Sequence, residues 1–111
     1  MGQVWVAGEV LIDLIPEGAD RKPVVGGGPA NTAKALAKLG IDTQFIEGIS
    51  SDVYGQMAKN ELKTAGVKLD YVMYSVKPTC LAIVLLSDSG SAYYEFVIEN
   101  TATFDFTHDW L

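Results

Sequence analysis

The chain has 111 residues, of which 49% are hydrophobic and 20% are charged, and its eight basic and fourteen acidic residues give a net charge of −6. This length and composition predict one soluble globular domain. The acidic balance argues against nucleic acid or an anionic membrane as a partner, and no apolar run is long enough to span a bilayer. The single cysteine, Cys80, allows no internal disulfide and fits a reducing cytoplasm.

Hydrophobic periodicity predicts alternating strands and helices along the chain. In chain order we expect strands at residues 3–7, 11–15 and 22–25, a helix at 30–39, a strand at 43–49, a helix from the Asp52 cap to residue 65, a strand at 69–73, and a hairpin with strands at 81–86 and 92–98. The Ser-Asp-Ser-Gly sequence at 87–90 is typical of the turn that such a hairpin needs. This order predicts an α/β fold, with a parallel sheet flanked by helices and additional antiparallel strands.

Residues 26–31 read Gly-Gly-Gly-Pro-Ala-Asn and open directly into the first predicted helix. Glycines let a ligand come close to the backbone, and Pro29 suits the first helical turn. The free N–H groups at the helix start attract polar or anionic groups. The run therefore predicts a receptor for a polar or anionic small molecule.

Two ligand classes compete for this glycine run. A dinucleotide fingerprint would use Gly26 and Gly28, with Glu47 binding a ribose hydroxyl. That pattern needs a third glycine where this chain has Asn31, and Pro23 interrupts the strand that precedes it. The favoured alternative makes Asn31 the ligand-binding group, because its side-chain amide can both donate to and accept from a sugar hydroxyl. A turn without any ligand is the third interpretation.

Several segments resemble, in the same order, the PfkB/ribokinase family of carbohydrate kinases, and within it the fructokinase-like members. Residues 4–16 contain Gly-Glu-x-x-x-Asp-x-x-Pro after the first strand, and residues 26–40 are similar to the first family signature. Residues 49–55 resemble Val-Gly-x-Asp-x-Phe-Gly, and residues 79–100 resemble the family's lid hairpin. The resemblance spans essentially the whole chain. It departs at Ser50, where the family usually has Gly, and at Thr103, where many fructokinases have Asp.

The resemblance implies a ribokinase-like fold in which a small antiparallel lid, with strands at about 11–25 and 81–98, covers the sugar. Residues 1–111 would then form the N-terminal part of a single, longer kinase domain. The implied activity is ATP-dependent phosphorylation of a hydroxyl on fructose or a related furanose. ATP and Mg²⁺ would be bound mainly outside this segment, together with the catalytic base, so we assign no catalytic, cofactor-binding or metal-binding residue within it.

The candidate substrate-binding residues are Asp13, Gly26, Gly27, Asn31 and Asn100. Asp13 interrupts an apolar run, where a carboxylate is costly unless it is paired or faces a ligand, and it can accept two sugar hydroxyls at once. Gly26 and Gly27 would offer backbone N–H groups at close approach. Each has a structural alternative, namely the outward face of a lid strand for Asp13, turn geometry for the glycines and helix capping for Asn31. Asn100 lies where the family's chain leaves the lid.

Other residues carry less definite expectations. Glu9 would either orient Asn31 or serve as a structural carboxylate, and His108, the only histidine, lacks the neighbours that a metal site needs. Tyr94, Phe96 and Ile98 alternate along one face of the hairpin, which would cover the sugar, pack within the lid or pair with a second copy as a homodimer. The remaining functional alternatives are a flavin- or nicotinamide-binding oxidoreductase segment and a non-catalytic sugar-binding fragment.

Overall fold

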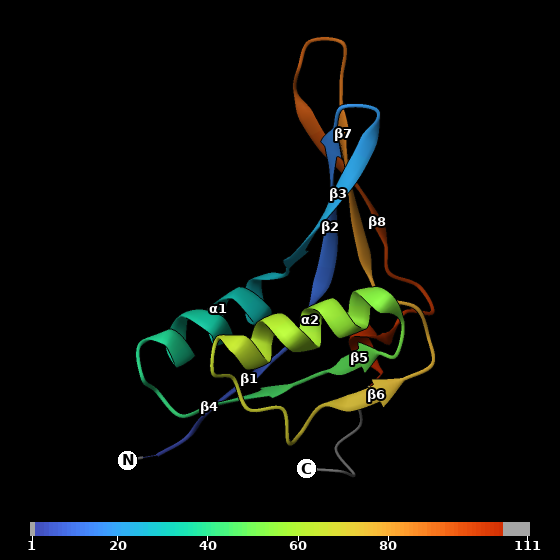
Figure 1. Cartoon of the computed structure of the whole chain (residues 1–111). Coiled ribbons are helices and arrows are strands. Elements are labelled where there is room, and N and C mark those ends of the chain that lie inside the picture. The colour runs from blue at the N-terminus through green and yellow to red at the C-terminus, as the bar shows by residue number, and fades with distance from the viewer. Residues whose placement is uncertain (1, 106–111) are drawn as a thin grey trace.

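The computed structural model describes residues 2–105, which form a body of helices and parallel strands with two hairpins rising from it (Figure 1). The hairpins extend the molecule to 51 Å along its longest axis, against 30 and 19 Å along the others. We call these hairpins the lid. Among the described residues, no helix is both long and apolar enough to cross a membrane.

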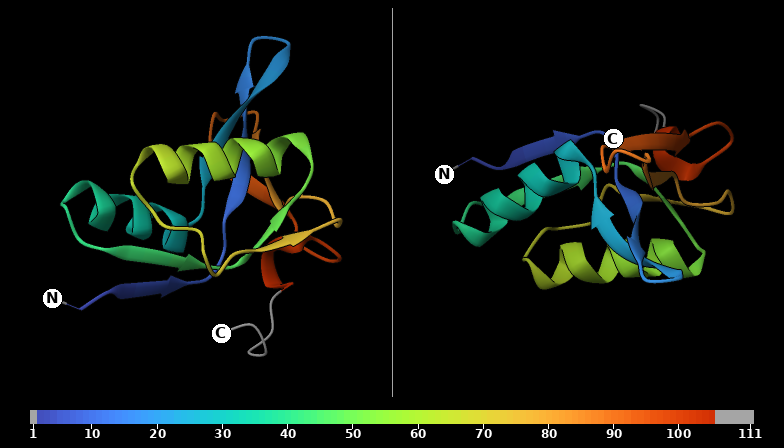
Figure 2. Two further views of the ribbon diagram at one scale, coloured as in Figure 1. Left: turned by 60° about the horizontal axis from the view of Figure 1, so that its bottom comes forward. Right: turned by 90° about the horizontal axis from the view of Figure 1, so that it is seen from above.

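The body consists of four strands, two helices and a short 3-10 turn, which are β1 (Val4–Ala7), α1 (Gly28–Lys38), β4 (Thr43–Ile46), β5 (Gly48–Ser50), α2 (Val53–Thr64), β6 (Met73–Ser75) and η1 (Ala102–Phe104). β1 pairs in parallel with β4, and β5 pairs in parallel with β6. Both helices cover the same face of these strands (Figure 2). The main core lies between the two layers and includes Phe45, Ile49 and Leu62, each at most 1% exposed.

The lid contains β2 (Leu11–Glu17), β3 (Asp20–Gly26), β7 (Leu81–Leu86) and β8 (Ala92–Val97), in the spatial order β3-β2-β7-β8. Each hairpin is antiparallel, as predicted, but β2 and β7 pair in parallel, with Ile12 opposite Leu81. The lid is therefore a mixed sheet and not a purely antiparallel one. The reason is that both strands leave the body in the same direction (Figure 1).

α2 begins at its predicted cap, and α1 begins close to its predicted start. α1 starts at Gly28, with Gly27 as its N-cap and the proline in the first turn, two residues before the predicted start. α2 has Asp52 as its N-cap, whose Oδ1 accepts the N–H of Gly55 at 2.8 Å. Both helix positions thus follow from local sequence chemistry.

The predicted strand at 69–73 is wrong, because the strand begins only at Met73. The side chain of Gln44 takes the place of a ladder partner for Asp70. Its Nε2 donates to Asp70 Oδ2 at 2.6 Å, and its Oε1 accepts the Asp70 N–H at 3.2 Å. The N–H of Val72 then turns back to the carbonyl of Leu69. A distant side chain therefore replaces the expected extended backbone with a turn.

Two further expectations need correction. The predicted strand at 43–49 is divided into β4 and β5 at Glu47, whose own carboxyl accepts the N–H of Gly48 at 2.9 Å. The segment before the glycine run is a seven-residue strand in spite of Pro23. Proline is tolerated there because β3 lies at the edge of the lid, where one side of the strand needs no ladder hydrogen bonds.

Candidate functional site

The glycine run lies where β3 leaves the lid and α1 enters the body. Gly26 lies directly against Asp13, because a Cβ built on Gly26 would collide with the Asp13 carboxylate. Gly27 has a φ of 102°, and a Cβ there would come within 2.7 Å of the Glu9 carbonyl oxygen and 3.2 Å of Val10 Cα. Glycine is therefore required at Gly27 for both space and backbone conformation, whereas a Cβ at Gly26 would fit only if the Asp13 side chain moved.

Asp13 lies in the middle of β2, opposite Val24 on one side and Ala82 on the other. Its side chain is half-buried, and this burial raises the pKa of the carboxyl above its ordinary value. Within residues 2–105, neither carboxylate oxygen has a hydrogen-bond or salt-bridge partner. A half-buried carboxylate without a protein partner is available to accept hydroxyl groups of a ligand.

Asn31 follows the glycine run in the first turn of α1. Its backbone N–H donates to the carbonyl of Gly27 at 2.9 Å, so its position is tied to the same turn. Its side chain is exposed and makes no hydrogen bond within the part of the chain that the structure describes, so it does not cap the helix. Asp13, Gly26, Gly27 and Asn31 thus form a continuous series of neighbours, which we call the lid-base arc.

Asn100 follows β8, which is separated from β2 by β7 in the lid sheet. Its φ of 57° places it in the left-handed region, where asparagine is tolerated better than most residues. It belongs to a turn in which the N–H of Thr101 donates to the carbonyl of Ile98 at 3.2 Å. This local conformation supplies a structural reason for the asparagine. His108 lies outside the described residues.

The dinucleotide interpretation does not fit this geometry. The strand before the glycines belongs to an antiparallel hairpin of the lid, whereas the fingerprint requires a parallel strand-helix-strand unit. Glu47, the residue expected to bind a ribose, is fully buried beneath the lid. The local sequence of the glycine run is similar in the two cases, and only the pairing of β3 separates them.

Sequence reasoning missed the polar contacts that hold the lid to the body. Asp52 accepts the backbone N–H of Thr79 at 2.9 Å and its hydroxyl at 2.6 Å, just before β7. Although burial by itself would raise it, these hydrogen bonds together with that of Gly55 hold the pKa of the Asp52 carboxyl below its ordinary value. The sequence contained one indication of these contacts, because Thr79 is a polar residue just before an apolar strand.

A second buried contact involves Glu47 and Thr103, at the opposite side of the lid base. The hydroxyl of Thr103 lies 2.9 Å from Glu47 Oε2 and 3.5 Å from the carbonyl oxygen of Val10. Burial, and to a smaller extent the charge of Glu9, raises the pKa of Glu47 to about 8, although hydrogen bonds from Gly48 and Thr103 oppose the shift. A Glu-Gly pair within an apolar run was the sequence signal for this residue.

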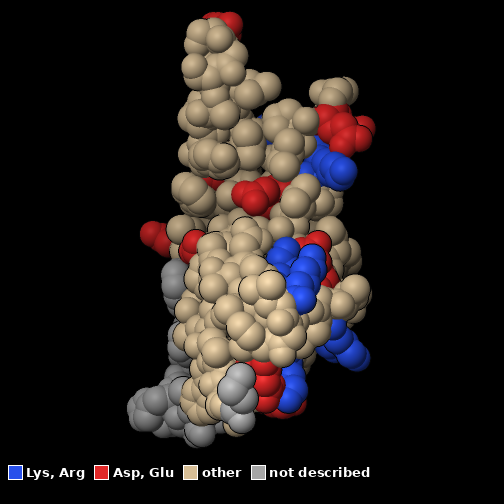
Figure 3. All heavy atoms as spheres, turned by 90° about the vertical axis from the view of Figure 1, so that its left-hand side faces the viewer, with Lys and Arg blue, Asp and Glu red and all other residues tan. Residues whose placement is uncertain are grey.

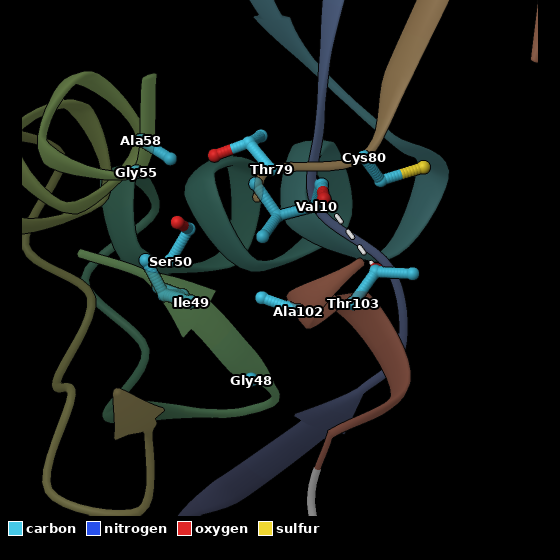
Figure 4. A pocket seen from close by; sticks show the side chains of 10 residues that line it. All are labelled: Val10, Gly48, Ile49, Ser50, Gly55, Ala58, Thr79, Cys80, Ala102 and Thr103. Atoms are coloured by element: carbon cyan, nitrogen blue, oxygen red, sulfur yellow. Dashed lines mark hydrogen bonds between the residues drawn. The ribbon is translucent and has the colours of Figure 1, made fainter. Parts of the chain in front are cut away.

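Between these two contacts is a cavity of about 10 Å³, lined by Val10, by residues of β5, α2 and η1, and by the two residues just before β7 (Figure 4). Val10, Thr79 and Thr103 lie around it, and the dashed line in Figure 4 marks the contact between Thr103 and Val10. A space of this size holds about one water molecule, so it is too small for a sugar. It is a gap in packing beneath the lid and not a ligand site.

The charges of the molecule gather on the body and on the shorter hairpin, whereas the taller β7–β8 hairpin is nearly uncharged along the face in Figure 3, apart from acidic atoms at its tip. All six residues of β8 are exposed. Tyr94 and Phe96 stack with their ring centroids 6.0 Å apart. The lid thus presents an apolar, partly aromatic strand to its surroundings.

Within residues 2–105, no three His, Cys, Asp or Glu side chains are grouped so as to hold a metal ion.

Comparisons with known proteins agree with one another. The chain matches the family described as "pfkB family carbohydrate kinase" over residues 1–111. It is 34% identical over 102 residues to the protein named fructokinase from Escherichia coli, which is 90% of this chain and 33% of that protein. The chain therefore spans about a third of the length of the curated relatives that it matches.

Solved structures give the same result. The fructokinase from Xylella fastidiosa with bound ATP matches at a TM-score of 0.88 and 31% identity, over 97% of this chain and 34% of that one. The fructokinase from Vibrio cholerae O395 in its fructose-, ADP- and calcium-bound form matches at a TM-score of 0.78 and 27% identity, over 93% of this chain and 34% of that one.

Proposed function

The chain belongs to the pfkB family of carbohydrate kinases, and from this premise we propose that the whole protein transfers the γ-phosphoryl group of ATP to a hydroxyl of fructose or a related furanose. The similarity to proteins named fructokinase supports this choice of sugar. The bound ATP in one related structure, and the fructose and ADP in another, support the two substrates.

The chain's own part in this reaction is to bind and orient the sugar. The observation that carries this assignment is the Asp13 carboxylate, which is half-buried, lies against Gly26 and has no hydrogen-bond or salt-bridge partner among residues 2–105. A carboxylate there accepts two neighbouring hydroxyls, the Asn31 amide both donates and accepts, and the glycines leave room for the sugar to approach the backbone. These groups hold one hydroxyl in a fixed position for attack on the γ-phosphorus.

Phosphoryl transfer also requires a base that takes the hydroxyl proton, and groups that neutralise the charge on the phosphates. ATP with Mg²⁺ supplies the phosphoryl group and its charge neutralisation. The grouped carboxylates that Mg²⁺ prefers are absent from residues 2–105. By resemblance to the family, we place the base outside this chain and the nucleotide and the metal mainly outside it, and Asn100 remains an additional candidate sugar contact.

The remaining proposals concern the cellular compartment of the protein and the contacts of its exposed lid strand. We propose that the protein is cytoplasmic, consistent with its single unpaired cysteine, Cys80. The exposed aromatic face of β8 serves either as a cover for the apolar side of the sugar or as the contact with a second copy in a homodimer. Both uses would remove Tyr94 and Phe96 from water, which their 56% and 57% exposure in the single chain favours.

The test is ATP-dependent phosphorylation of a panel of ketoses and nucleosides by the whole protein, with Asp13→Asn as the variant. Asp20→Asn is the matched control, because Asp20 is exposed at the turn of the same hairpin. We expect Asp13→Asn to lower kcat/KM for the sugar about 10- to 100-fold, with KM for ATP and the control unchanged.

Three results would contradict this proposal in different ways. Sugar binding without turnover by the whole protein would indicate a non-catalytic sugar-binding protein. Binding of a flavin or nicotinamide would make the dinucleotide interpretation the favoured one. Turnover that is equal in the Asp13→Asn and Asp20→Asn variants would refute the role of Asp13 while leaving the kinase activity standing.

A further inference from the structure

Glu47 is a fully buried carboxyl at the break between β4 and β5. Its backbone carbonyl accepts the N–H of Met73, so the main chain continues to pair with β6 while the side chain reaches η1. No lysine or arginine of the described part forms a salt bridge with it. A carboxyl that is buried without a cation is stable only if hydrogen bonds satisfy it or if it stays neutral.

The single hydrogen of the Thr103 hydroxyl distinguishes the ionised from the neutral state of Glu47. The Thr103 hydroxyl has one hydrogen but faces two oxygens, Glu47 Oε2 at 2.9 Å and the Val10 carbonyl at 3.5 Å. If Glu47 is ionised, both oxygens are acceptors and the single hydrogen can satisfy only one of them. If Glu47 is protonated on Oε2, it donates to Thr103 and the Thr103 hydrogen is free for Val10. Only the neutral acid satisfies both contacts.

Val10 connects the contact between Glu47 and Thr103 to the lid-base arc. Gly27 rests on Glu9 and Val10, since a Cβ on Gly27 would come within 3.2 Å of Val10 Cα. The carbonyl of Gly27 in turn accepts the N–H of Asn31. The contacts therefore run from Glu47 through Thr103 and Val10 to the turn on which the sugar-binding residues are placed.

We propose that Glu47 is a positioning residue for the sugar site, which as a neutral acid donates to Thr103 so that Thr103 can hold the Val10 carbonyl and thereby the Gly27 turn. This inference rests on the proposed function. It also predicts that pH regulates the sugar site. Ionised Glu47 would accept a hydrogen bond from the Thr103 hydroxyl, and the Val10 carbonyl would then lose this donor.

The surroundings of Glu47 favour its neutral form at physiological pH. Three titratable groups face it or lie beside it, which are Glu9 from the turn after β1, Cys80 before β7, and Asp105 near Gly48. The first two become negative when ionised and oppose a charge on Glu47, whereas Asp105 is paired with Lys77 at 3.1 Å. Burial raises the pKa of Glu47 to about 8, which sets the pH at which the contact should loosen.

The experiment measures kcat and KM for the sugar between pH 6.5 and 9.5 in the whole protein. We expect the wild-type KM to rise several-fold above about pH 8. In Glu47→Gln, the amide Nε2 always donates to Thr103 and Oε1 still accepts from Gly48, so KM should stay low across the range. Thr103→Val, which removes the bridging hydroxyl at similar volume, should have a raised KM at every pH. Glu17→Gln, at an exposed position, is the control and should follow wild type.

A second measurement separates this inference from the proposed function. Amide hydrogen exchange of residues 8–12 and 26–31, corrected for the intrinsic effect of pH, needs no sugar. Protection that falls above about pH 8 in wild type but not in Glu47→Gln supports the inference, even if no sugar is phosphorylated. The inference is overturned if Glu47→Gln keeps the alkaline rise in KM, or if Thr103→Val leaves the protection of both segments unchanged. Absence of turnover at every pH overturns the proposed function alone.

Discussion

Gly26→Ala tests the contact between the glycine run and Asp13 by adding a single methyl group. The φ of Gly26 is not in the left-handed region, so alanine is compatible with the backbone. The added Cβ would meet the Asp13 carboxylate, and beyond it the Leu11 side chain at 3.4 Å. Because the carboxylate is the end of a rotatable side chain, we expect Asp13 to turn away while β2 and β3 keep their pairing.

The structure predicts a small loss of stability and a larger loss of sugar binding. Moving Asp13 off its preferred rotamer costs about 0.5–1.5 kcal/mol of the free energy of unfolding. The displaced carboxylate would lose the hydrogen bonds that we propose it makes to the sugar, each worth about 1.5–3 kcal/mol when the acceptor is charged. Since about 1.4 kcal/mol corresponds to a tenfold change in affinity, the loss of one such bond should raise KM for the sugar about 10- to 100-fold, and the loss of both should raise it further.

The assay compares Gly26→Ala with Gly28→Ala in thermal unfolding and sugar kinetics. Gly28 has open space around its Cα at the start of α1, so alanine there should be neutral or stabilising by up to about 1 kcal/mol. Adding Asp13→Ala removes the atom that the new methyl group meets, so Gly26→Ala should cost no stability in that background. The reasoning is refuted if Gly26→Ala destabilises equally with and without Asp13, or if Gly28→Ala impairs sugar binding as much.

Three further predictions concern stability and assembly. Gly55→Ala should lower the free energy of unfolding by at least about 3 kcal/mol in denaturant titration, because its Cβ would strike the backbone carbonyl of Ser50, which cannot rotate away; a normal unfolding midpoint would contradict this. Asp52→Ala should cost on the order of 3 kcal/mol through loss of the helix cap and the Thr79 bonds. Because the pKa of Asp52 is lowered, this stabilisation is present above the ordinary value of 3.8 and is lost as pH falls below it, which acid titration of wild type against the variant would detect. If the whole protein forms the proposed lid-paired dimer, Phe96→Asp should convert it to monomers in sedimentation velocity, and a wild-type dimer that persists in the variant would exclude β8 from the subunit contact.

The elements that could be predicted from the sequence are those that local chemistry determines. The Asp52 cap, the proline at the start of α1 and the Ser-Asp-Ser-Gly turn each act within a few residues, and the structure has the helices and the β7–β8 hairpin there. The turn at 69–71 instead involves hydrogen bonds with the side chain of Gln44, and the Glu47 side chain at the division between β4 and β5 is hydrogen-bonded to Thr103 in η1. Such contacts join distant parts of the chain, and periodicity contains no information about them.

The candidate site follows the same distinction. The adjacency of Gly27 and Asn31 is a property of one helix start and was predictable. The contact of Asp13 with Gly26 follows from the register of a hairpin, in which Asp13 lies opposite Val24. The series from Glu47 to Val10 could not be predicted, because it requires β4, η1 and the β1–β2 turn to meet beneath the lid. The ligand roles of Asp13, Gly26, Gly27, Asn31 and Asn100 stay predictions.

The parallel pairing of β2 with β7 has a consequence for the order in which the molecule folds. Ile12 and Leu81 are neighbours in the lid but lie far apart in the sequence, so closing the intervening loop is costly in chain entropy before the pairing stabilises it. During synthesis, the β2–β3 hairpin leaves the ribosome long before its partner strand exists. An isolated two-stranded hairpin is marginally stable in water. The Asp13 side of the proposed sugar site should therefore become ordered late, after the helices and strands of the body have assembled.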